Sequence, residues 1–138
     1  MSTRSYIGIL NPDKTIRAVY CHNNGYPDYM GPILIKYHNS KQAAQKIVAL
    51  GSLSSLQEKL SPETKTHSFD SPENGVTVAY CRDRGEDLEI LRYESIENIV
   101  RSAERDGISY IYLYDSNTDK WIYRETHKND FKRLAVEK

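Results

Sequence analysis

Two short apolar segments near the start of the chain, joined by a proline turn, restrict the fold more than any other feature. Ser5–Leu10 and Ile16–Cys21 are dominated by apolar residues, and Asn11-Pro12-Asp13-Lys14 between them places proline where its fixed φ favours a turn. This pattern predicts a β-hairpin. Gly8 would weaken the first strand unless another part of the chain approaches its backbone closely. We therefore expect a helix packed against Gly8, or a β-bulge.

The spacing of apolar residues predicts short helices and strands in the rest of the chain. Ser40 and Ser95 are placed to cap two helices, which Gly51 and Gly107 are placed to end. Helices are predicted for residues 31–38 (with Pro32 in the first turn), 41–50, 96–105 and, resting Phe131, Leu134 and Ala135 on the body, 128–137; residues 52–56 are predicted as a single turn; further strands are predicted for 76–81, 88–93, 109–114 and 121–124.

These elements predict an α+β fold. We expect an antiparallel sheet of short strands, made of two hairpins plus a central strand, with three to four helices packed on one face. Residues 1–138 are predicted to form a single domain, in which residues 57–75 are a long polar connection rich in Ser, Thr and Pro. Tyr110, Tyr112 and Tyr114 alternate with Ile111 and Leu113, so we expect one face of that strand to be core and the tyrosine face to be an interface or the wet side of the sheet.

Composition narrows the functional class. A chain of 138 residues is long enough to bury one hydrophobic core, and its 19 Lys and Arg residues balance its 19 Asp and Glu residues. That balance argues against a sequence-specific nucleic-acid-binding domain, which normally carries a broad basic face. No segment approaches the ~18 apolar residues of a membrane span. Because Met-Ser-Thr-Arg-Ser leads directly into the first strand, we expect no secretory segment, a cytoplasmic location and reduced thiols at Cys21 and Cys81.

Two polar stretches are candidates for a shared ligand pocket. The loop from Tyr20 to Gly31 carries aromatic rings and amide side chains, and the second stretch carries two arginines at the end of a predicted strand. Rings stack on bases, amides read base edges, and a guanidinium pairs with phosphate. The predicted ligand-binding residues are Tyr20, His22, Asn23, Asn24, Tyr26, Tyr29, Arg82 and Arg84. The alternative is a surface network of Arg and Asp followed by a turn at Gly85.

Metal and catalytic sites are less well supported by the sequence. Zinc would need Cys21, His22, His67 and Cys81 to meet, but no Cys-x-x-Cys spacing organises them, so buried thiols and loop histidines are the expected state, with no metal and no cofactor. Cys21 and His22 are neighbours on a strand and point to opposite faces, which argues against a thiol activated by that imidazole. An acid–base pair drawn from His67, Asp70, Asp83 and Glu86 stays open, although loop carboxylates are mostly solvated.

Several short motifs resemble a family of small, uncharacterised proteins of tailed bacteriophages and prophages. The resemblance covers about the first two-thirds of the chain and lies in Thr3-Arg4-Ser5-x-Ile7-Gly8-Ile9, Tyr20-Cys21-His22-x-x-Gly25-Tyr26-Pro27-x-x-x-Gly31-x-x-Leu34, Ala49-Leu50-Gly51-x-x-Ser54-Ser55-Leu56, His67-Ser68-Phe69-Asp70 and Gly75-Val76-Thr77-Val78-Ala79-Tyr80-x-Arg82-Asp83-Arg84-Gly85-Glu86. Asn23 and Asn24 stand where the family's loop has Trp and Asp. The resemblance implies an accessory phage protein acting in the host cytoplasm, and no particular chemistry.

Three functions follow from the resemblance and the residues together. The first is a non-catalytic phage protein that counteracts host defence by sequestering a nucleotide-derived immune signal. The second is an inhibitor that binds a host protein directly, and the third is a small nucleotide hydrolase. The expected partner is a nucleotide-derived small molecule or a host protein, and a homo-oligomer is expected because a chain of this length rarely encloses a nucleotide alone.

Overall fold

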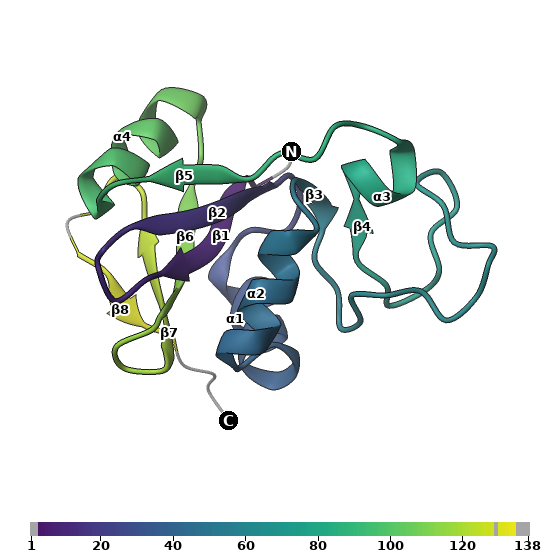
Figure 1. Cartoon of the computed structure of the whole chain (residues 1–138), viewed down its shortest axis with the longest axis horizontal. Coiled ribbons are helices and arrows are strands. Elements are labelled where there is room, and N and C mark those ends of the chain that lie inside the picture. The colour runs from purple at the N-terminus through teal and green to yellow at the C-terminus, as the bar shows by residue number, and fades with distance from the viewer. Residues whose placement is uncertain (1–2, 129, 135–138) are drawn as a thin grey trace.

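The computed structural model describes residues 3–128 and 130–134, which form a twisted mixed sheet with helices on both faces (Figure 1). Strands and helices alternate irregularly along the chain. Their order is β1 (Ser5–Leu10), β2 (Ile16–Cys21), α1 (Pro27–Tyr37), α2 (Lys41–Ala49), β3 (Leu53–Ser55), β4 (Val78–Ala79), α3 (Tyr80–Arg84), β5 (Leu91–Tyr93), α4 (Ile96–Asp106), β6 (Tyr110–Asp115), β7 (Lys120–Glu125) and β8 (Lys132–Arg133). No helix in the described part of the chain is long and apolar enough to cross a membrane.

The sheet is mixed, so the prediction of an antiparallel sheet is wrong. Its strand order is β4-β3-β2-β1-β6-β7-β8, and β5 pairs with the free half of β2. The two predicted hairpins, β1–β2 and β6–β7, are confirmed as antiparallel pairs. The pairs β1–β6 and β2–β3 are parallel. These pairs join segments that are distant in the chain, and no local pattern in the sequence reveals them.

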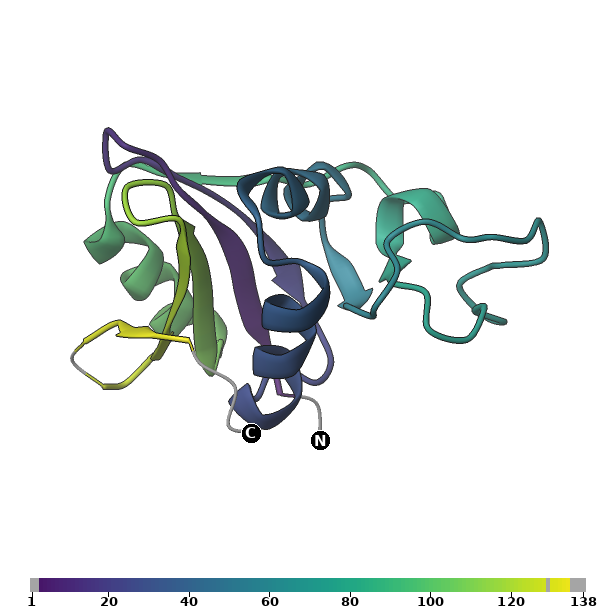
Figure 2. The same cartoon turned by 90° about the horizontal axis from the view of Figure 1, so that it is seen from below.

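Both faces of the sheet are covered, which corrects the prediction of helices on one face. α1 and α2 pack on the face that carries Ile7 and Ile9, and α4 packs on the opposite face. Figure 2 shows α4 on one side of the strands and α1 with α2 on the other. All six residues of β1 are buried because the strand lies between these two layers.

The tyrosine face of β6 is core rather than interface or wet surface. Tyr112 is 0% exposed and Tyr114 is 4% exposed, both beneath α1 and α2, while Ile111 and Leu113 face α4. The Tyr112 hydroxyl donates a hydrogen bond of 2.7 Å to the carbonyl oxygen of Gly25. Burial raises the pKa of Tyr112, so its phenol stays protonated. This bond attaches the loop before α1 to the middle of the sheet.

Gly8 is required by a strand rather than by a helix or a bulge. A Cβ atom at this position would lie 2.2 Å from the carbonyl oxygen of Arg17 and 2.7 Å from the Cα atom of Ala18. Gly8 and Ala18 are direct partners in the β1–β2 register. The expected close approach therefore exists, and the neighbouring backbone of β2 makes it.

The predicted caps of the two amphipathic helices are confirmed. The Ser40 hydroxyl accepts from the amide of Ala43, the Ser95 hydroxyl accepts from the amide of Asn98, and Gly107 follows α4 with φ of 73°. Other boundaries differ from the prediction. α1 begins four residues earlier, at Pro27, so Pro32 lies inside it, and residues 53–55 form β3. Residues 80–84 form α3, so the last two residues of the predicted strand 76–81 are helical.

The predicted tail helix is also wrong in the part that the structure describes. Lys132 and Arg133 form β8, which pairs antiparallel with β7. Leu134 is buried against the α1 face, as expected for an apolar residue that rests on the body. Ala135, which was predicted to pack beside it, lies outside the described residues.

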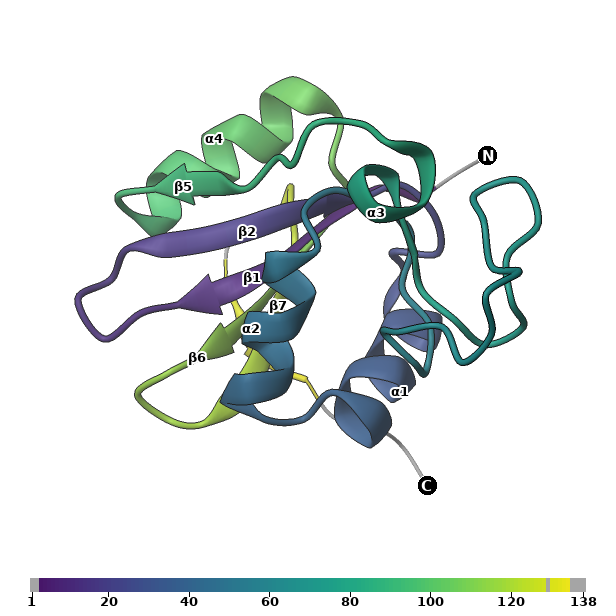
Figure 3. The same cartoon turned by 45° about the vertical axis from the view of Figure 1, so that its right-hand side comes forward.

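Residues 57–77 and 80–87, on either side of the short edge strand β4, extend to one side of the sheet, and we call them the arm (Figures 2 and 3). The long polar connection, residues 57–75, lies in this arm. Contacts made by His67 and Phe69 hold the connection to α3. The imidazole Nε2 of His67 lies 3.1 Å from Asp83 Oδ2, and its Nδ1 accepts a hydrogen bond of 2.9 Å from the amide of Glu73. The Phe69 and Tyr80 rings lie 5.5 Å apart, and the Arg84 guanidinium lies 4.8 Å from the Phe69 ring. Side chains of the connection therefore hold it against α3.

Replacing Tyr112 by Phe tests the attachment of the loop to the sheet. The variant leaves the buried carbonyl of Gly25 without its hydrogen bond, so we expect the free energy of unfolding to fall by about 1–3 kcal/mol in urea denaturation. Tyr110→Phe is the matched control, since the structure gives the Tyr110 hydroxyl no hydrogen bond within the described residues, and it should change stability by less than about 0.5 kcal/mol. Equal losses in the two variants would contradict this account.

Candidate functional site

One cavity of about 430 Å³ combines tyrosine rings with arginine and carboxylate side chains. Two of the rings, Tyr20 and Tyr93, are half-buried, and the third, Tyr6, is only 3% exposed. We call this cavity the Arg4–Tyr93 pocket. It lies on the α4 face of the sheet, between the start of β1, the end of β2, β5 and the end of α4. Its lining residues are Arg4, Tyr6, Tyr20, Glu89, Leu91, Arg92, Tyr93, Ser102, Arg105, Asp106 and Ile108.

Strand alternation and register bring the aromatic rings together. Tyr6 on β1 and Tyr20 on β2 are direct partners in the hairpin, so their side chains leave the sheet on the same face. Arg4 is two residues before Tyr6 and shares that face. On β5, Tyr93 faces α4 with Ile16, its register partner, and the Tyr6 and Tyr93 ring centroids are 6.2 Å apart. Arg92 alternates with Tyr93, so its side chain leaves β5 on the other face.

A chain of hydroxyl groups lines the floor of the pocket. Ser102 Oγ lies 2.8 Å from the Tyr93 hydroxyl and 3.0 Å from the Tyr6 hydroxyl, which in turn donates to Asp106 Oδ2 at 3.3 Å. Ser102 and Asp106 are four residues apart on α4 and therefore share one helix face. Arg105 pairs with the Asp106 carboxylate at 3.1 Å and lowers its pKa, while burial raises the pKa of Tyr6. The carboxylate is thus ionised and the phenol neutral at pH 7.

The rim carries two charged side chains that are available to a ligand. Arg4 and Glu89 are exposed, and neither side chain forms an ion pair or hydrogen bond with another residue in the described ranges 3–128 and 130–134. The Arg4 guanidinium is close enough to the Tyr20 phenol to lower its pKa, although burial has the larger effect and raises it. The Tyr20 hydroxyl lies 2.6 Å from Nδ1 of His22. The pocket therefore offers oriented tyrosine rings, an exposed arginine and an exposed glutamate.

The arrangement suits binding better than covalent chemistry. The Ser102 hydroxyl contacts two phenols, so no imidazole or carboxylate is placed to activate it as a nucleophile in the described part of the site. Burial raises the pKa of the Cys21 thiol to about 12, and the thiol donates to the carbonyl oxygen of Asn23. A buried thiol of this kind is inert.

The predicted ligand-binding arginines are engaged inside the arm. Arg82 donates to the carbonyl oxygens of Leu60 and Thr77 and pairs with Asp83. Arg84 pairs with Glu86 and covers the Phe69 ring. Both arginines lie on the helical turn α3, and not at the end of a strand as predicted. Arg84 does line a separate cavity of about 370 Å³, with Ser68, Phe69, Asp70 and Asp83.

Two of the six predicted residues in the first loop hold it to β3 and to the segment that follows β3. Asn23 bonds to Ser54 through its backbone amide and its side chain, and the Tyr29 hydroxyl donates to the carbonyl of Leu56. Asn24 adopts a left-handed φ of 59°, and Tyr26, which is exposed, precedes the first residue of α1. Tyr20 lines the Arg4–Tyr93 pocket, and His22 bonds to Tyr20.

The two predicted loops do not share a cleft among the cavities described here. β3 lies between them in the sheet, with β2 on one side and β4, which leads into α3, on the other. None of the three cavities described in this section contains residues from both loops. Within residues 3–128 and 130–134, no three His, Cys, Asp or Glu side chains are grouped as metal ligands, and His67 pairs with Asp83 rather than with a cysteine.

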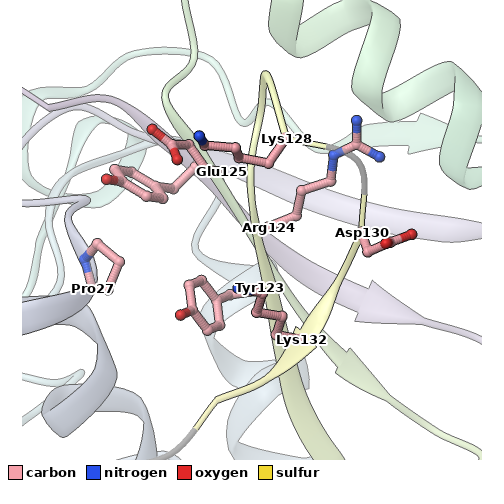
Figure 4. A pocket seen from close by; sticks show the side chains of 8 residues that line it. Pro27, Tyr123, Arg124, Glu125, Lys128, Asp130 and Lys132 are labelled. Atoms are coloured by element: carbon pink, nitrogen blue, oxygen red, sulfur yellow. The ribbon is translucent and has the colours of Figure 1, made fainter.

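A second cavity, of about 480 Å³, opens on the α1 face (Figure 4). It is lined by Pro27, Tyr110, Tyr123, Arg124, Glu125, Lys128, Asp130 and Lys132. Figure 4 shows Tyr123 and Lys132 beside each other, across the opening from Pro27. This cavity has two tyrosine rings and basic side chains offset by Glu125 and Asp130. The Arg4–Tyr93 pocket also has two half-buried rings, and it adds a connected hydroxyl network that orients its lining, so it is the better candidate.

The sequence analysis did not predict this pocket, although the sequence contains part of the pattern that forms it. The predicted hairpin already pairs Tyr6 with Tyr20, and alternation already places Arg4 beside them. The contributions of Tyr93, Ser102 and Asp106 depend on β5 pairing with β2 and on α4 crossing that face, which are tertiary features. No protein-family model matches the chain, and no curated protein or solved structure with which it was compared shows significant similarity.

The Asp83 network predicts a pH dependence of stability. Burial alone would raise the pKa of Asp83, but the bonds from Arg82, the amide of Ala79 and His67 outweigh it and hold the pKa below its usual value. A lowered pKa stabilises the fold above the unfolded value of about 3.9, and this contribution is lost as the pH falls through the folded value. Asp83→Asn should therefore be less stable than the unmodified protein at pH 7, and the difference should shrink below about pH 4.

Urea denaturation across this pH range measures the effect. Asp70→Asn is the control, because Asp70 is an exposed aspartate on the same arm, and its stability should follow that of the unmodified protein at every pH. If the free energy of unfolding of the Asp83→Asn variant differed from that of the unmodified protein by the same amount from neutral to acidic pH, the stabilising role of the ionised Asp83 carboxylate would be contradicted.

Proposed function

We propose that the protein is a non-catalytic binding protein that holds a small nucleotide-derived ligand in the Arg4–Tyr93 pocket. The observation that carries the proposal is the presence of two half-buried tyrosine rings, Tyr20 and Tyr93, and an unpaired arginine side chain around one cavity of about 430 Å³ within the described residues. Aromatic side chains stack on bases of any sequence, and guanidinium groups pair with phosphate oxygens. The volume lies within the usual range of small-molecule sites, roughly 300–1,000 Å³.

The orientation of the tyrosine rings supports a binding role. Tyr93 is fixed by Ser102 and Tyr20 is fixed by His22, so a ligand would meet two rings that are already oriented. Preorganised groups reduce the entropy lost on binding. A single chain forms the pocket, so binding does not require the homo-oligomer expected from the length of the chain, and that oligomer stays a prediction.

Sequestration of a nucleotide-derived immune signal is the biological role that we propose for this binding. Its support is the resemblance to phage accessory proteins together with the aromatic and cationic lining of the pocket. Direct inhibition of a host protein and nucleotide hydrolysis are the competing roles. Recovery of chemically unchanged ligand after heat denaturation of the complex separates sequestration from hydrolysis.

Isothermal titration calorimetry with AMP, GMP, ADP-ribose and cyclic dinucleotides tests the binding proposal. We expect at least one of these to bind the unmodified protein, and Arg4→Ala to weaken that binding about 10-fold to 100-fold, because the variant loses a charge-assisted contact to phosphate. Lys128→Ala is the matched control, since it removes one cation from the cavity of Figure 4 and should leave the affinity unchanged. Loss of binding in the Lys128 variant alone, or no binding of any probe, would overturn the proposal.

A further inference from the structure

We propose that the Arg4–Tyr93 pocket selects a guanine base, whose Watson–Crick edge is read by the carboxylate of Glu89. This inference rests on the proposed function, because it assumes that the pocket binds a nucleotide. It adds the identity of the base and names the side chain that distinguishes it.

Glu89 is the carboxylate that the pocket leaves available. Of the two carboxylates in the lining, Asp106 already accepts from the Tyr6 hydroxyl and pairs with Arg105. Glu89 is exposed at the rim and has no ion-pair or hydrogen-bond partner for its side chain in the described part of the chain. A base stacked against the tyrosine wall would therefore meet one carboxylate with both oxygens free to accept.

Base chemistry then decides the preference. A carboxylate only accepts hydrogen bonds, so it pairs best with an edge that presents two donors side by side. Guanine presents N1–H and the 2-amino group in that arrangement. Adenine presents the 6-amino donor next to N1, an acceptor whose lone pair would face a carboxylate oxygen. The same comparison disfavours cytosine, which presents one donor beside the acceptor N3.

The hydroxyl groups of the pocket agree with this polarity. The Tyr6 hydroxyl donates to Asp106, so Ser102 donates to Tyr6, and Tyr93 in turn donates to Ser102. All three hydroxyl protons are therefore used within this network. The phenol oxygens that remain can only accept. Arg4 is the cation of the lining that stays available for an anionic group, so a ligand with a donor-rich base and a phosphate satisfies both ends of the rim.

The inference is tested by calorimetric titration of the full chain with GMP, IMP and AMP. We expect GMP to bind about 5-fold to 150-fold more tightly than AMP, the discrimination typical of a bidentate contact to a base. IMP, which keeps N1–H but lacks the 2-amino group, should lie between them. A Glu89→Gln variant should abolish the preference, because the amide of Gln offers one acceptor and one donor and so matches both the 6-amino group and N1 of adenine and the N1–H and O6 of guanine.

Glu104→Gln is the control, since Glu104 lies exposed on α4 outside the pocket lining, and it should keep the preference of the unmodified protein. Equal binding of GMP and AMP would overturn the guanine inference and leave the proposed function in place. A guanine preference that survives in the Glu89 variant would overturn the role of Glu89. Failure of all three nucleotides to bind the unmodified protein would overturn both this inference and the binding of mononucleotides on which it rests.

Discussion

The rest of the structure depends on the complete burial of β1. All six of its residues are buried, because β2 and β6 pair with its two edges and helices cover its two faces. A strand in this position cannot present a wet face, so apolar side chains on both sides of the sheet need a covering layer. α1 and α2 provide one layer and α4 provides the other. Gly8 is the position on β1 where the neighbouring strand leaves no room for a side chain.

The candidate site forms where this double cover ends. α4 stops at Asp106, and Gly107 turns the chain away with a positive φ. The sheet face that packs against α4 continues past the end of this helix to Arg4, which precedes β1, and to Tyr20 on β2. The last turn of α4 supplies Ser102 and Asp106, which hold the nearest tyrosine hydroxyls in place. The pocket is therefore the uncovered end of the sheet face that packs against α4. Its tyrosine rings are continuous with the buried residues between that face and α4.

The sequence predicted local features well and tertiary ones poorly, for a physical reason. Hairpin turns, serine caps and glycine stops depend on neighbouring residues, and the first hairpin, α2 and α4 are where the pattern placed them. The parallel pairing of β1 with β6 joins distant segments, so neither the mixed sheet nor the burial of Tyr112 could be predicted. Of the predicted ligand-binding residues, Tyr20 lines the pocket, whereas Arg82 and Arg84 are engaged in contacts within the arm.

Chemical-shift mapping of the protein with GMP tests the central claim, that the uncovered end of the α4 face is the ligand site. In two-dimensional ¹H–¹⁵N spectra, this account predicts that the largest shifts fall on amides near Arg4, Tyr20 and Tyr93 and in the last turn of α4. The amides of α2 and of the arm should stay in place. Shifts concentrated around Tyr123 and Lys132, or no shift at a saturating concentration of ligand, would contradict it.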